Sequence, residues 1–512
     1  MPGIHDTLAG WLADYDAAGA DAARLLCDRH DPQAVAFRFV NPDLTSETMT
    51  YGELADRSRR LATALAERGV KREDRVPVLM GKRPELVVTL LAIWRLGAVH
   101  VPLFTAFATG AIRLRVEGSA ARLVVTEPDQ RAKLDPIDGI EVLETGPEFD
   151  ALVSGSAPLA ENEAVGGDGA LLQLYTSGTT GKPKAVVVPV RALAAFHCYL
   201  HYGLDVQAED VYWNAADPGW AYGLYYGIVA PLVAGRPNLL FQGGFTPEST
   251  AAVMREHGVT NFAGAPTMYR ALSKSGALSG VTLRRASSAG EPLTPDVVTW
   301  GEQTLGTPIR DHYGQTELGM VIGNHWHADV VGPIKDGSMG RPLPGFAAGV
   351  VDGQIAIDTP ASPLLWFAGY HEAPDKTAER FTEDTRWYLT GDTGRVDEDG
   401  YYFFTARDDD VILAAGYRIG PFDVESVLIT HPQVTDVAVV GRPDPEGIRG
   451  EVVEAFVVTT AAPAEQDALA RALQDLVRDT YSRHAYPRTV HFVDALPKTP
   501  SGKIQRYLLR QR

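Results

Sequence analysis

A loop rich in glycine and hydroxyl side chains, set between two apolar runs, is the feature that most restricts how this chain can fold. Residues 171–175 are mostly apolar and residues 185–188 are mostly β-branched, so both flanks favour strands. The loop between them, residues 176–184, reads TSGTTGKPK. Its glycines let the backbone approach a ligand, and its hydroxyls and two lysines supply donors and positive charge for a polyphosphate. The candidate phosphate-binding residues are Thr176, Ser177, Gly178, Thr179, Thr180, Gly181, Lys182, Pro183 and Lys184.

Two other interpretations of this loop fit the sequence less well. The Walker A loop has the pattern Gly-x-x-x-x-Gly-Lys-[Ser/Thr] and joins a strand to a helix. Here Thr176 stands where the first glycine belongs, Pro183 follows Lys182, and the next segment favours a strand. A flexible linker would also be rich in glycine and serine, but the apolar flanks and the lysines argue against one.

An alternation of helices and strands precedes the loop. Residues 52–69 have apolar side chains at helical spacing and end at a glycine, and residues 75–80 read as a buried strand. The pattern continues with an expected helix at 85–96, a strand at 98–103, a helix at 111–117 and a strand at 121–126. This pattern is typical of a doubly wound α/β sheet. A chain of 512 residues exceeds a single ordinary core, so we expect two or more domains.

The composition excludes several classes of protein. A hydrophobic content of 45% and a charged content of 22% are typical of a soluble globular protein, and the net charge of −18 disfavours a nucleic-acid or anionic-membrane partner. The two cysteines, Cys27 and Cys198, show no metal-ligand spacing, as suits a reducing cytoplasm. No basic and apolar leader is evident, and the most apolar stretch, residues 224–241, contains two prolines and an arginine. We therefore expect a cytoplasmic protein without membrane insertion.

Four further polar segments lie downstream of the loop. Residues 287–293 (SSAGEPL) follow an expected strand at 281–285, and residues 311–317 read DHYGQTE. Residues 387–392 (WYLTGD) read as a strand that ends in a turn with one carboxylate, and residues 496–506 (LPKTPSGKIQR) form a basic segment near the C-terminus. By itself, each of these would most often be a turn or a solvated surface.

Taken together and in this order, the loop and the four segments resemble the motifs of the acyl-adenylate-forming superfamily. This superfamily comprises acyl-CoA synthetases, luciferases and the adenylation domains of peptide synthetases, and the short- and medium-chain acyl-CoA synthetases resemble the chain most. The motifs run from residue 176 to residue 506, so the resemblance covers nearly the whole chain. It implies an ATP-dependent ligase that joins a carboxylic acid to CoA through an acyl-adenylate and releases AMP and pyrophosphate.

The resemblance also implies an α/β fold with two domains. The large N-terminal domain, residues 1–406, would contain doubly wound sheets and a small β-barrel. Residues 407–512 would form a small, mobile α/β domain that acts as a lid, with a hinge near residues 407–410.

The resemblance assigns most of the ATP contacts to the downstream segments. Tyr313 would offer its face to the adenine, Thr316 its hydroxyl to the α-phosphate, and Asp392 its carboxylate to the ribose, with Arg407 as partner. Glu317 would supply the hard oxygen ligand that Mg²⁺ prefers. The ATP-binding residues outside the loop would be Gly290, Glu291, Pro292, Asp311, His312, Tyr313, Gly314, Gln315, Thr316, Asp392, Arg407 and Arg418.

Lys503 matches the catalytic lysine of the family. A carboxylate that attacks the α-phosphate meets a group that is itself negative, so a lysine cation and Mg²⁺ would stabilise the developing charge. Asp409 matches the hinge about which the small domain would turn between the two half-reactions. The residues that match CoA contacts are Ala415, Gly416, Tyr417, Arg449, Tyr486, Pro487 and Arg488.

Trp220, Tyr222 and Gly314 are the candidates for the pocket of the acid. Residues 217–223 resemble the Asp-x-Gly-Trp segment of the family, although aromatic residues are most often simply core residues. Acetate-specific relatives carry a tryptophan at the position of Gly314. The missing side chain is therefore expected to leave an empty volume for a medium-chain or aryl acid, in which each buried CH₂ contributes about 0.8 kcal/mol.

The sequence leaves other functions open. The acyl group could pass to a carrier-protein thiol, an amine or another nucleophile, because the first half-reaction uses the same residues. A nucleotide-binding regulator without catalysis would not need Lys503. A metal site at His197 and His201, four residues apart, lacks a third ligand, and residues 325–327 are more typical of packing. Monomer and homodimer remain equally open.

Overall fold

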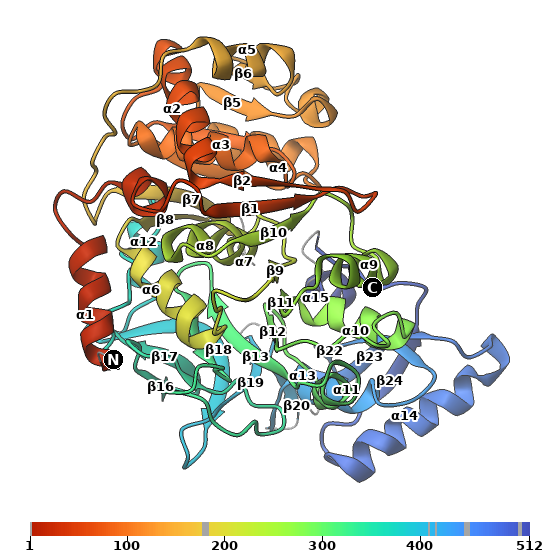
Figure 1. Cartoon of the computed structure of the whole chain (residues 1–512). Coiled ribbons are helices and arrows are strands. Elements are labelled where there is room, and N and C mark those ends of the chain that lie inside the picture. Colours follow the sequence, from red (N-terminus) through yellow and green to blue (C-terminus); the bar gives the residue numbers. More distant parts are fainter. Residues whose placement is uncertain (1–2, 177–183, 408–409, 415–416, 445–450, 500–503) are drawn as a thin grey trace.

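The computed structural model describes residues 3–176, 184–407, 410–414, 417–444, 451–499 and 504–512, and of Tyr417 and Arg418 only the backbone. The strands of these residues form five sheets, and helices separate most of them along the chain, so the predicted α/β class is confirmed. In Figure 1 the helices between residues 51 and 155 lie at the top, the first helix, α1 (Ile4–Tyr15), lies at the left, and most of the segment after Arg407 lies at the lower right.

A six-stranded sheet with the order β6-β5-β3-β4-β7-β8 forms one half of the large N-terminal part. Its strands are β3 (Arg75–Leu79), β4 (Val99–Leu103), β5 (Leu123–Thr126), β6 (Glu141–Glu144), β7 (Ala170–Thr176) and β8 (Lys184–Pro189). Its helices are α2 (Tyr51–Glu67), α3 (Pro84–Arg95), α4 (Thr109–Gly118), η2 (Pro128–Lys133) and α5 (Pro147–Gly155). From β3 the chain adds β4 on one side and β5 on the other, all parallel, which confirms the doubly wound sheet.

Local signals in the sequence set the bounds of these elements. The Thr50 hydroxyl accepts from the Glu53 N–H while the Glu53 carboxylate accepts from the Thr50 N–H, and this capping box starts α2. Gly69, at φ 88°, follows the helix end in the left-handed region that glycine adopts without strain. All five side chains of β4 are buried, as expected for an inner parallel strand covered on both faces.

A nine-stranded sheet with the order β15-β14-β13-β12-β11-β9-β10-β1-β2 forms the second half. Its strands are β1 (Val35–Val40), β2 (Ser46–Thr50), β9 (Tyr212–Asn214), β10 (Asn238–Phe241), β11 (Asn261–Gly264), β12 (Arg285–Ala289), β13 (Ile309–Gln315), β14 (Gly319–Gly323) and β15 (Arg341–Pro342). The expected strand at 281–285 is wrong, because β12 begins where it was expected to end. Ser287 and Ser288, expected to follow the strand, are buried inside it between β11 and β13.

Helices and helical turns cover this second sheet and join it to the first. They are α1 (Ile4–Tyr15), η1 (Arg24–Asp28), α6 (Ala192–Cys198), η3 (Tyr199–Gly203), α7 (Ala221–Leu224), η4 (Tyr225–Val229), α8 (Ala230–Ala234), α9 (Pro247–His257), α10 (Pro266–Ser275) and α11 (Pro295–Leu305). One continuous apolar core extends from α2 and α3 through α6 and η4 to β14. The site residues near these elements therefore rest on a rigid base.

A four-stranded antiparallel sheet follows, with the order β16-β17-β18-β19. Its strands are β16 (Ala348–Val351), β17 (Gln354–Asp358), β18 (Trp387–Val396) and β19 (Tyr402–Arg407), and α12 (Pro374–Ala378) precedes β18. The described strands form an open sheet and not the closed barrel that was expected, because β16 and β19 are its two edges and do not pair. The expected turn at Asp392 is also wrong, since β18 continues through it to Val396.

The C-terminal part has its own sheets and core. Its elements are β20 (Ile412–Ala414), β21 (Tyr417–Ile419), α13 (Pro421–Leu428), β22 (Val434–Pro443), β23 (Glu451–Thr459), η5 (Pro463–Glu465), α14 (Gln466–Thr480), β24 (Thr489–Phe492) and α15 (Arg506–Arg510). The last strand of the preceding sheet ends at Arg407. The boundary between residues 406 and 407 is compatible with this arrangement and stays a prediction.

Across the part of the chain that the structure describes, none of the helices combines the length and the apolar character that crossing a membrane requires.

Candidate active site

The ends of the phosphate-loop candidate are fixed by strand pairing. Thr176 closes β7 and Lys184 opens β8, and the two residues face one another in the antiparallel register. The Thr176 hydroxyl donates to the Lys184 carbonyl oxygen at 3.4 Å. The loop thus joins two strands, as predicted, and its remaining candidates, residues 177–183, lie outside the described residues.

Asp392 brings two of the predicted motifs together. Its Oδ2 accepts hydrogen bonds from the Tyr313 hydroxyl at 2.5 Å and from Gln315 Nε2 at 2.7 Å. Tyr313 and Gln315 lie at the end of β13, and Asp392 lies in β18 opposite Arg407 of β19. Segments 70 to 80 residues apart in the sequence therefore meet at one carboxylate. The polar donors keep this carboxylate oriented, as a group that binds a sugar hydroxyl must be.

Glu317 is buried beside a tyrosine that the sequence analysis missed. The Tyr370 hydroxyl donates to Glu317 Oε1 at 2.8 Å and accepts from Arg380 Nε at 3.1 Å. Lys184 Nζ lies 4.8 Å from the centroid of the Tyr370 ring, and burial, followed by the nearby Arg380 cation, lowers the pKa of Lys184. Arg380 also donates to the Thr390 carbonyl, which accepts from Gln315 as well. The Glu317 cluster and the Asp392 cluster are thus one network.

The residues at this network fit a magnesium ion that is carried by a nucleotide. The described residues contain no group of three or more His, Cys, Asp or Glu side chains able to hold a metal on their own. Mg²⁺ is instead commonly bound by one or two carboxylates together with substrate phosphates and water. Glu317 supplies one such carboxylate close to the phosphate-loop candidate Lys184.

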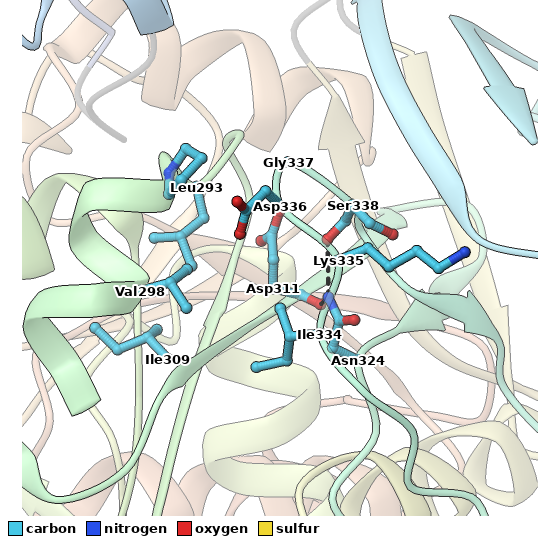
Figure 2. A pocket seen from close by; sticks show the side chains of 11 residues that line it. Leu293, Val298, Ile309, Asp311, Asn324, Ile334, Lys335, Asp336, Gly337 and Ser338 are labelled. Atoms are coloured by element: carbon cyan, nitrogen blue, oxygen red, sulfur yellow. Dashed lines mark hydrogen bonds between the residues drawn. The ribbon is translucent and has the colours of Figure 1, made fainter. Parts of the chain in front are cut away.

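A small pocket lies beside the DHYGQTE strand (Figure 2). Asp311 and Asn324 face it with apolar side chains, and Asn324 Nδ2 donates to the Ser338 carbonyl at 2.8 Å. Oδ1 of Asp311 is buried without a hydrogen-bond partner among the described residues, and burial raises the pKa of Asp311 well above its usual value. The apolar lining residues are Leu293, Pro295, Val298, Ile309 and Ile334. The lining is completed by Lys335, Asp336, Gly337 and Ser338, so the pocket is small and partly polar.

The GEP segment borders this pocket through Leu293. Gly290 has φ 103°, which glycine adopts without strain, and Pro292 follows it. The Glu291 carboxylate is paired with Arg270 Nη2 at 3.0 Å. The carboxylate of Glu291 is thus already paired, which leaves the backbone of the segment and the Pro292 ring for a contact with a base.

The aromatic segment after β9 has contacts with residues that follow β4 and with the motif strand β13. Trp220 contacts Phe104 and Phe107, with ring centroids 5.3 and 5.2 Å apart. The Tyr222 hydroxyl lies 3.1 Å from the Tyr199 hydroxyl, which lies 2.7 Å from Nδ1 of His312. Both residues are half-buried; Trp220 packs against residues that follow β4, whereas Tyr222 is linked to the motif strand β13 through Tyr199 and His312.

The structure corrects two expectations on β13. His312 is buried, and its ring lies between Tyr199 and the Asn324 carbonyl, so only its backbone could reach a nucleotide. Burial lowers the pKa of His312 to about 3, and the ring is neutral. A Cβ at Gly314 would lie 2.1 Å from the Gly319 carbonyl oxygen. The glycine allows β13 and β14 to approach, and the empty volume expected at this position is filled by backbone.

Several C-terminal candidates cannot be placed. Lys503, Asp409, Ala415, Gly416 and Arg449 lie outside the described residues, and Tyr417 and Arg418 are described only by their backbone in β21. Tyr486, Pro487 and Arg488 precede β24, and the Arg488 guanidinium stacks on the Tyr486 ring at 3.9 Å. Lys498 and Ile504 form an antiparallel bridge that brackets the segment with the predicted catalytic lysine.

The histidine pair has ordinary packing roles. His197 stacks on Trp11 at 4.2 Å and its Nδ1 lies 2.9 Å from the Tyr15 hydroxyl. His201 packs against His327 at 4.6 Å. His325 is buried, with Nε2 3.0 Å from the Arg341 carbonyl oxygen. These contacts agree with the interpretation of these histidines as packing residues.

Comparison with known proteins identifies the family to which the chain belongs. Residues 27–360 match the model of the family described as AMP-binding enzyme, and residues 423–503 match that of the AMP-binding enzyme C-terminal domain. The acetyl-coenzyme A synthetase of Bacillus subtilis (strain 168) is 35% identical over 527 residues, which cover 96% of this chain and 90% of that protein.

Two further relatives are similarly close. The mitochondrial acyl-coenzyme A synthetase ACSM3 of Rattus norvegicus is 35% identical over 518 residues, covering 93% of this chain and 86% of that protein. The crystal structure of an acyl-CoA synthetase from Brucella canis is 42% identical and has a TM-score of 0.77, covering 100% of this chain and 97% of that chain. The chain therefore belongs to the family of AMP-binding enzymes, as an AMP-forming acyl-CoA synthetase, an acid–thiol ligase.

Proposed function

We propose that this ligase, which like its family uses ATP and CoA, activates a medium-chain or aryl carboxylic acid at the network of Asp392, Glu317 and Lys184. The observation that carries the proposal is the convergence of separate motifs on this network. Asp392 lies where it can accept hydrogen bonds from ribose hydroxyls. Lys184 and the loop before it would hold the departing pyrophosphate, and Glu317 would hold Mg²⁺, which neutralises phosphate charge when bound.

The pocket beside β13 is the proposed adenine site. Leu293 and Ile309 would contact the base, and the buried Oδ1 of Asp311 would accept a hydrogen bond from the exocyclic amine. Tyr313, which is held by Asp392, would present its ring between base and ribose. A purine without this amine, such as the base of ITP, would leave the buried oxygen unpaired and should bind more weakly.

Adenylation turns a poor acyl donor into a good one. A carboxylate cannot expel oxide, whereas the mixed anhydride with AMP has a stable leaving group. The attacking carboxylate and the α-phosphate are both negative, so the barrier is largely electrostatic. Lys503 would act as a positioned cation in this step, and the thiol of CoA would then attack the anhydride carbonyl. Rotation of the C-terminal part between the two steps would remove Lys503 and admit the thiol.

The size of the acid is proposed from the aromatic wall. Trp220, packed on Phe104 and Phe107, and Tyr222, linked to β13 through Tyr199, would offer apolar surface to the acid. Each further buried CH₂ of the acid would gain about 0.8 kcal/mol. The Gly314 position does not support this choice of acid, because its side-chain volume is occupied by the backbone of Gly319.

The test is ATP–pyrophosphate exchange with a series of aliphatic, aromatic and amino acids, followed by thioester formation with CoA. Exchange should rise from acetate towards medium-length or aryl acids and require Mg²⁺. Lys503→Ala should lose exchange but retain thioester formation from supplied acyl-AMP, whereas equal loss of both steps would refute this division of roles. Exchange without a CoA thioester, but with transfer to a holo-carrier protein, would favour the alternative acceptor.

A further inference from the structure

Tyr370 lies at the centre of the network without belonging to any of the predicted motifs. It is buried, and it forms an isolated antiparallel bridge with Val186 of β8, the strand that follows the phosphate loop. Its N–H donates to the Thr377 hydroxyl at 2.9 Å. Its ring packs against Phe367, with centroids 5.2 Å apart. Backbone and ring are thus fixed independently of the hydroxyl.

The direction of the hydrogen bonds at the Tyr370 hydroxyl is determined by chemistry. Arg380 Nε can only donate, so the hydroxyl accepts from it and has its single proton left for Glu317 Oε1. The chain of donors runs from Arg380 through Tyr370 to the carboxylate. Arg380 is itself held, because it donates to the Thr390 carbonyl at 3.1 Å.

This arrangement restricts the rotation of the Glu317 carboxylate. Oε1 of Glu317 is held by the Tyr370 hydroxyl, which the Arg380 guanidinium orients. Hydrogen bonds to an ionised carboxylate are stronger than those between neutral groups. A carboxylate that binds a metal is generally oriented by such a partner, whose loss weakens metal binding 10- to 100-fold. Lys184, 4.8 Å from the same ring, places a phosphate-loop cation beside this carboxylate.

We propose that Tyr370, oriented by Arg380, is the positioning residue that holds Glu317 for the magnesium ion bound with ATP. The inference rests on the proposed function, in which Glu317 is the metal ligand. In this proposal Tyr370 acts only through Glu317, so its loss should weaken the coupling between metal and nucleotide and leave the metal-free binding of the nucleotide unchanged.

Tyr370→Phe is the direct test, because it removes the hydroxyl and retains the ring that contacts Lys184 and Phe367. Binding of α,β-methylene-ATP, which cannot transfer AMP, would be measured by calorimetry in EDTA and in saturating Mg²⁺. The Kd in EDTA divided by the Kd in Mg²⁺ reports how strongly metal binding and nucleotide binding support one another. In Tyr370→Phe this ratio should fall about tenfold relative to wild type, with the Kd in EDTA unchanged.

Three further variants are measured in the same way, one as a negative control and two as independent tests. Tyr51→Phe, which removes a buried hydroxyl from the start of α2, should leave the ratio unchanged. Glu317→Gln should lower the ratio at least as much as Tyr370→Phe. Arg380→Lys keeps the cation but changes the donor geometry, so it should lower the ratio in the same direction, and it provides a second test if Tyr370→Phe does not fold.

The outcomes separate this inference from the proposed function. A reduced ratio in Glu317→Gln with an unchanged ratio in Tyr370→Phe and Arg380→Lys would overturn the role of Tyr370 alone. A Kd in EDTA that rises as much as the Kd in Mg²⁺ would show a general loss of structure and would also overturn it. An unchanged ratio in Glu317→Gln would show that Glu317 is not the metal ligand, and both proposals would fail.

Discussion

Among single residues, Asp311 has the least favourable environment of the candidate site. It is 9% exposed, and within the described structure no hydrogen-bond partner reaches its Oδ1. Because burial raises the pKa of Asp311 well above its usual value, the folded protein retains a proton that the unfolded chain releases near pH 4. The stabilisation that the raised pKa of Asp311 contributes is fully present below about pH 4 and is lost as the pH rises through the folded-state pKa.

Asp311→Asn should remove this loss of stability, since an amide carries no charge at any pH. The free energy of unfolding of the nucleotide-free variant should equal that of wild type near pH 4 and exceed it at pH 8 by about 1–3 kcal/mol. Urea unfolding between pH 4 and pH 8 measures the difference. As a control, Asp358→Asn loses the ion pair with Arg386 and should not gain stability at pH 8. Parallel pH profiles of wild type and Asp311→Asn would contradict the assignment.

The sequence identified the motif residues of the site but not their supporting partners. Tyr313, Gln315 and Asp392 lie in recognisable motifs, and the structure brings them together. Tyr370 and Arg380 lie in a segment without helical or strand periodicity, and they reach Glu317 only because Tyr370 bridges to β8. Contacts of this kind depend on the tertiary arrangement, so a pattern within a single chain segment carries no signal for them.

At the scale of elements, strand β18 shows how a local irregularity in a strand, here a shift in its pairing with β17, can position a site residue. Gly391 precedes Asp392 with φ 74°, and a Cβ at this position would lie 2.9 Å from Arg380 Nη1. The glycine therefore serves two purposes. It allows the backbone to turn Asp392 towards Tyr313, and it leaves room for the guanidinium that orients Tyr370.

Gly391→Ala should lower both stability and activity. The positive φ alone costs about 1 kcal/mol or more when glycine is replaced, and the methyl group would displace Arg380. Gly400→Ala is the control, because Gly400 has φ 80° in the turn between β18 and β19 and a Cβ there meets nothing within 4 Å. Thermal unfolding should show a similar loss for both variants, but only Gly391→Ala should reduce ATP–pyrophosphate exchange. Equal exchange rates in the two variants would rule out the steric role.

The regular elements were predicted best where local signals and tertiary demands coincide. The capping box of α2 and the apolar run of β4 lie within single segments, and both elements were predicted correctly. The strand at 281–285 was misplaced because β12 consists mostly of alanine and serine, which have low strand propensity. Its pairing with β11 and β13 decides its position, and such pairing is a property of the whole sheet.

At the scale of the whole molecule, contacts around Asp410 indicate where the two parts can move. Asp410 accepts from Arg510 at 2.6 Å and lies 3.5 Å from Arg506, which also forms two 2.8 Å bonds with Glu425. The side chain of Asp410 thus contacts the C-terminal part, while its N–H donates at 2.9 Å to the carbonyl of Arg407, which pairs with Asp392 in β18. The hinge expected near residues 407–410 would lie between the end of β19 at Arg407 and these contacts of Asp410, and it stays a prediction.

Lys274 of α10 tests whether the observed orientation serves one half-reaction. Its Nζ donates to the Thr435 carbonyl of β22 at 2.7 Å, a contact between the two parts. A single exposed hydrogen bond of this kind contributes about 0.5–1 kcal/mol, so Lys274→Ala should slow the half-reaction that uses this orientation about two- to fivefold and leave the other unchanged. Single-turnover rates of adenylation, and of thioester formation from supplied acyl-AMP, measure the two steps separately. Lys71→Ala removes an exposed lysine far from the contact and should alter neither rate. If Lys274→Ala slows both steps equally, the contact does not distinguish the half-reactions, and the hinge motion must be driven by contacts elsewhere between the two parts.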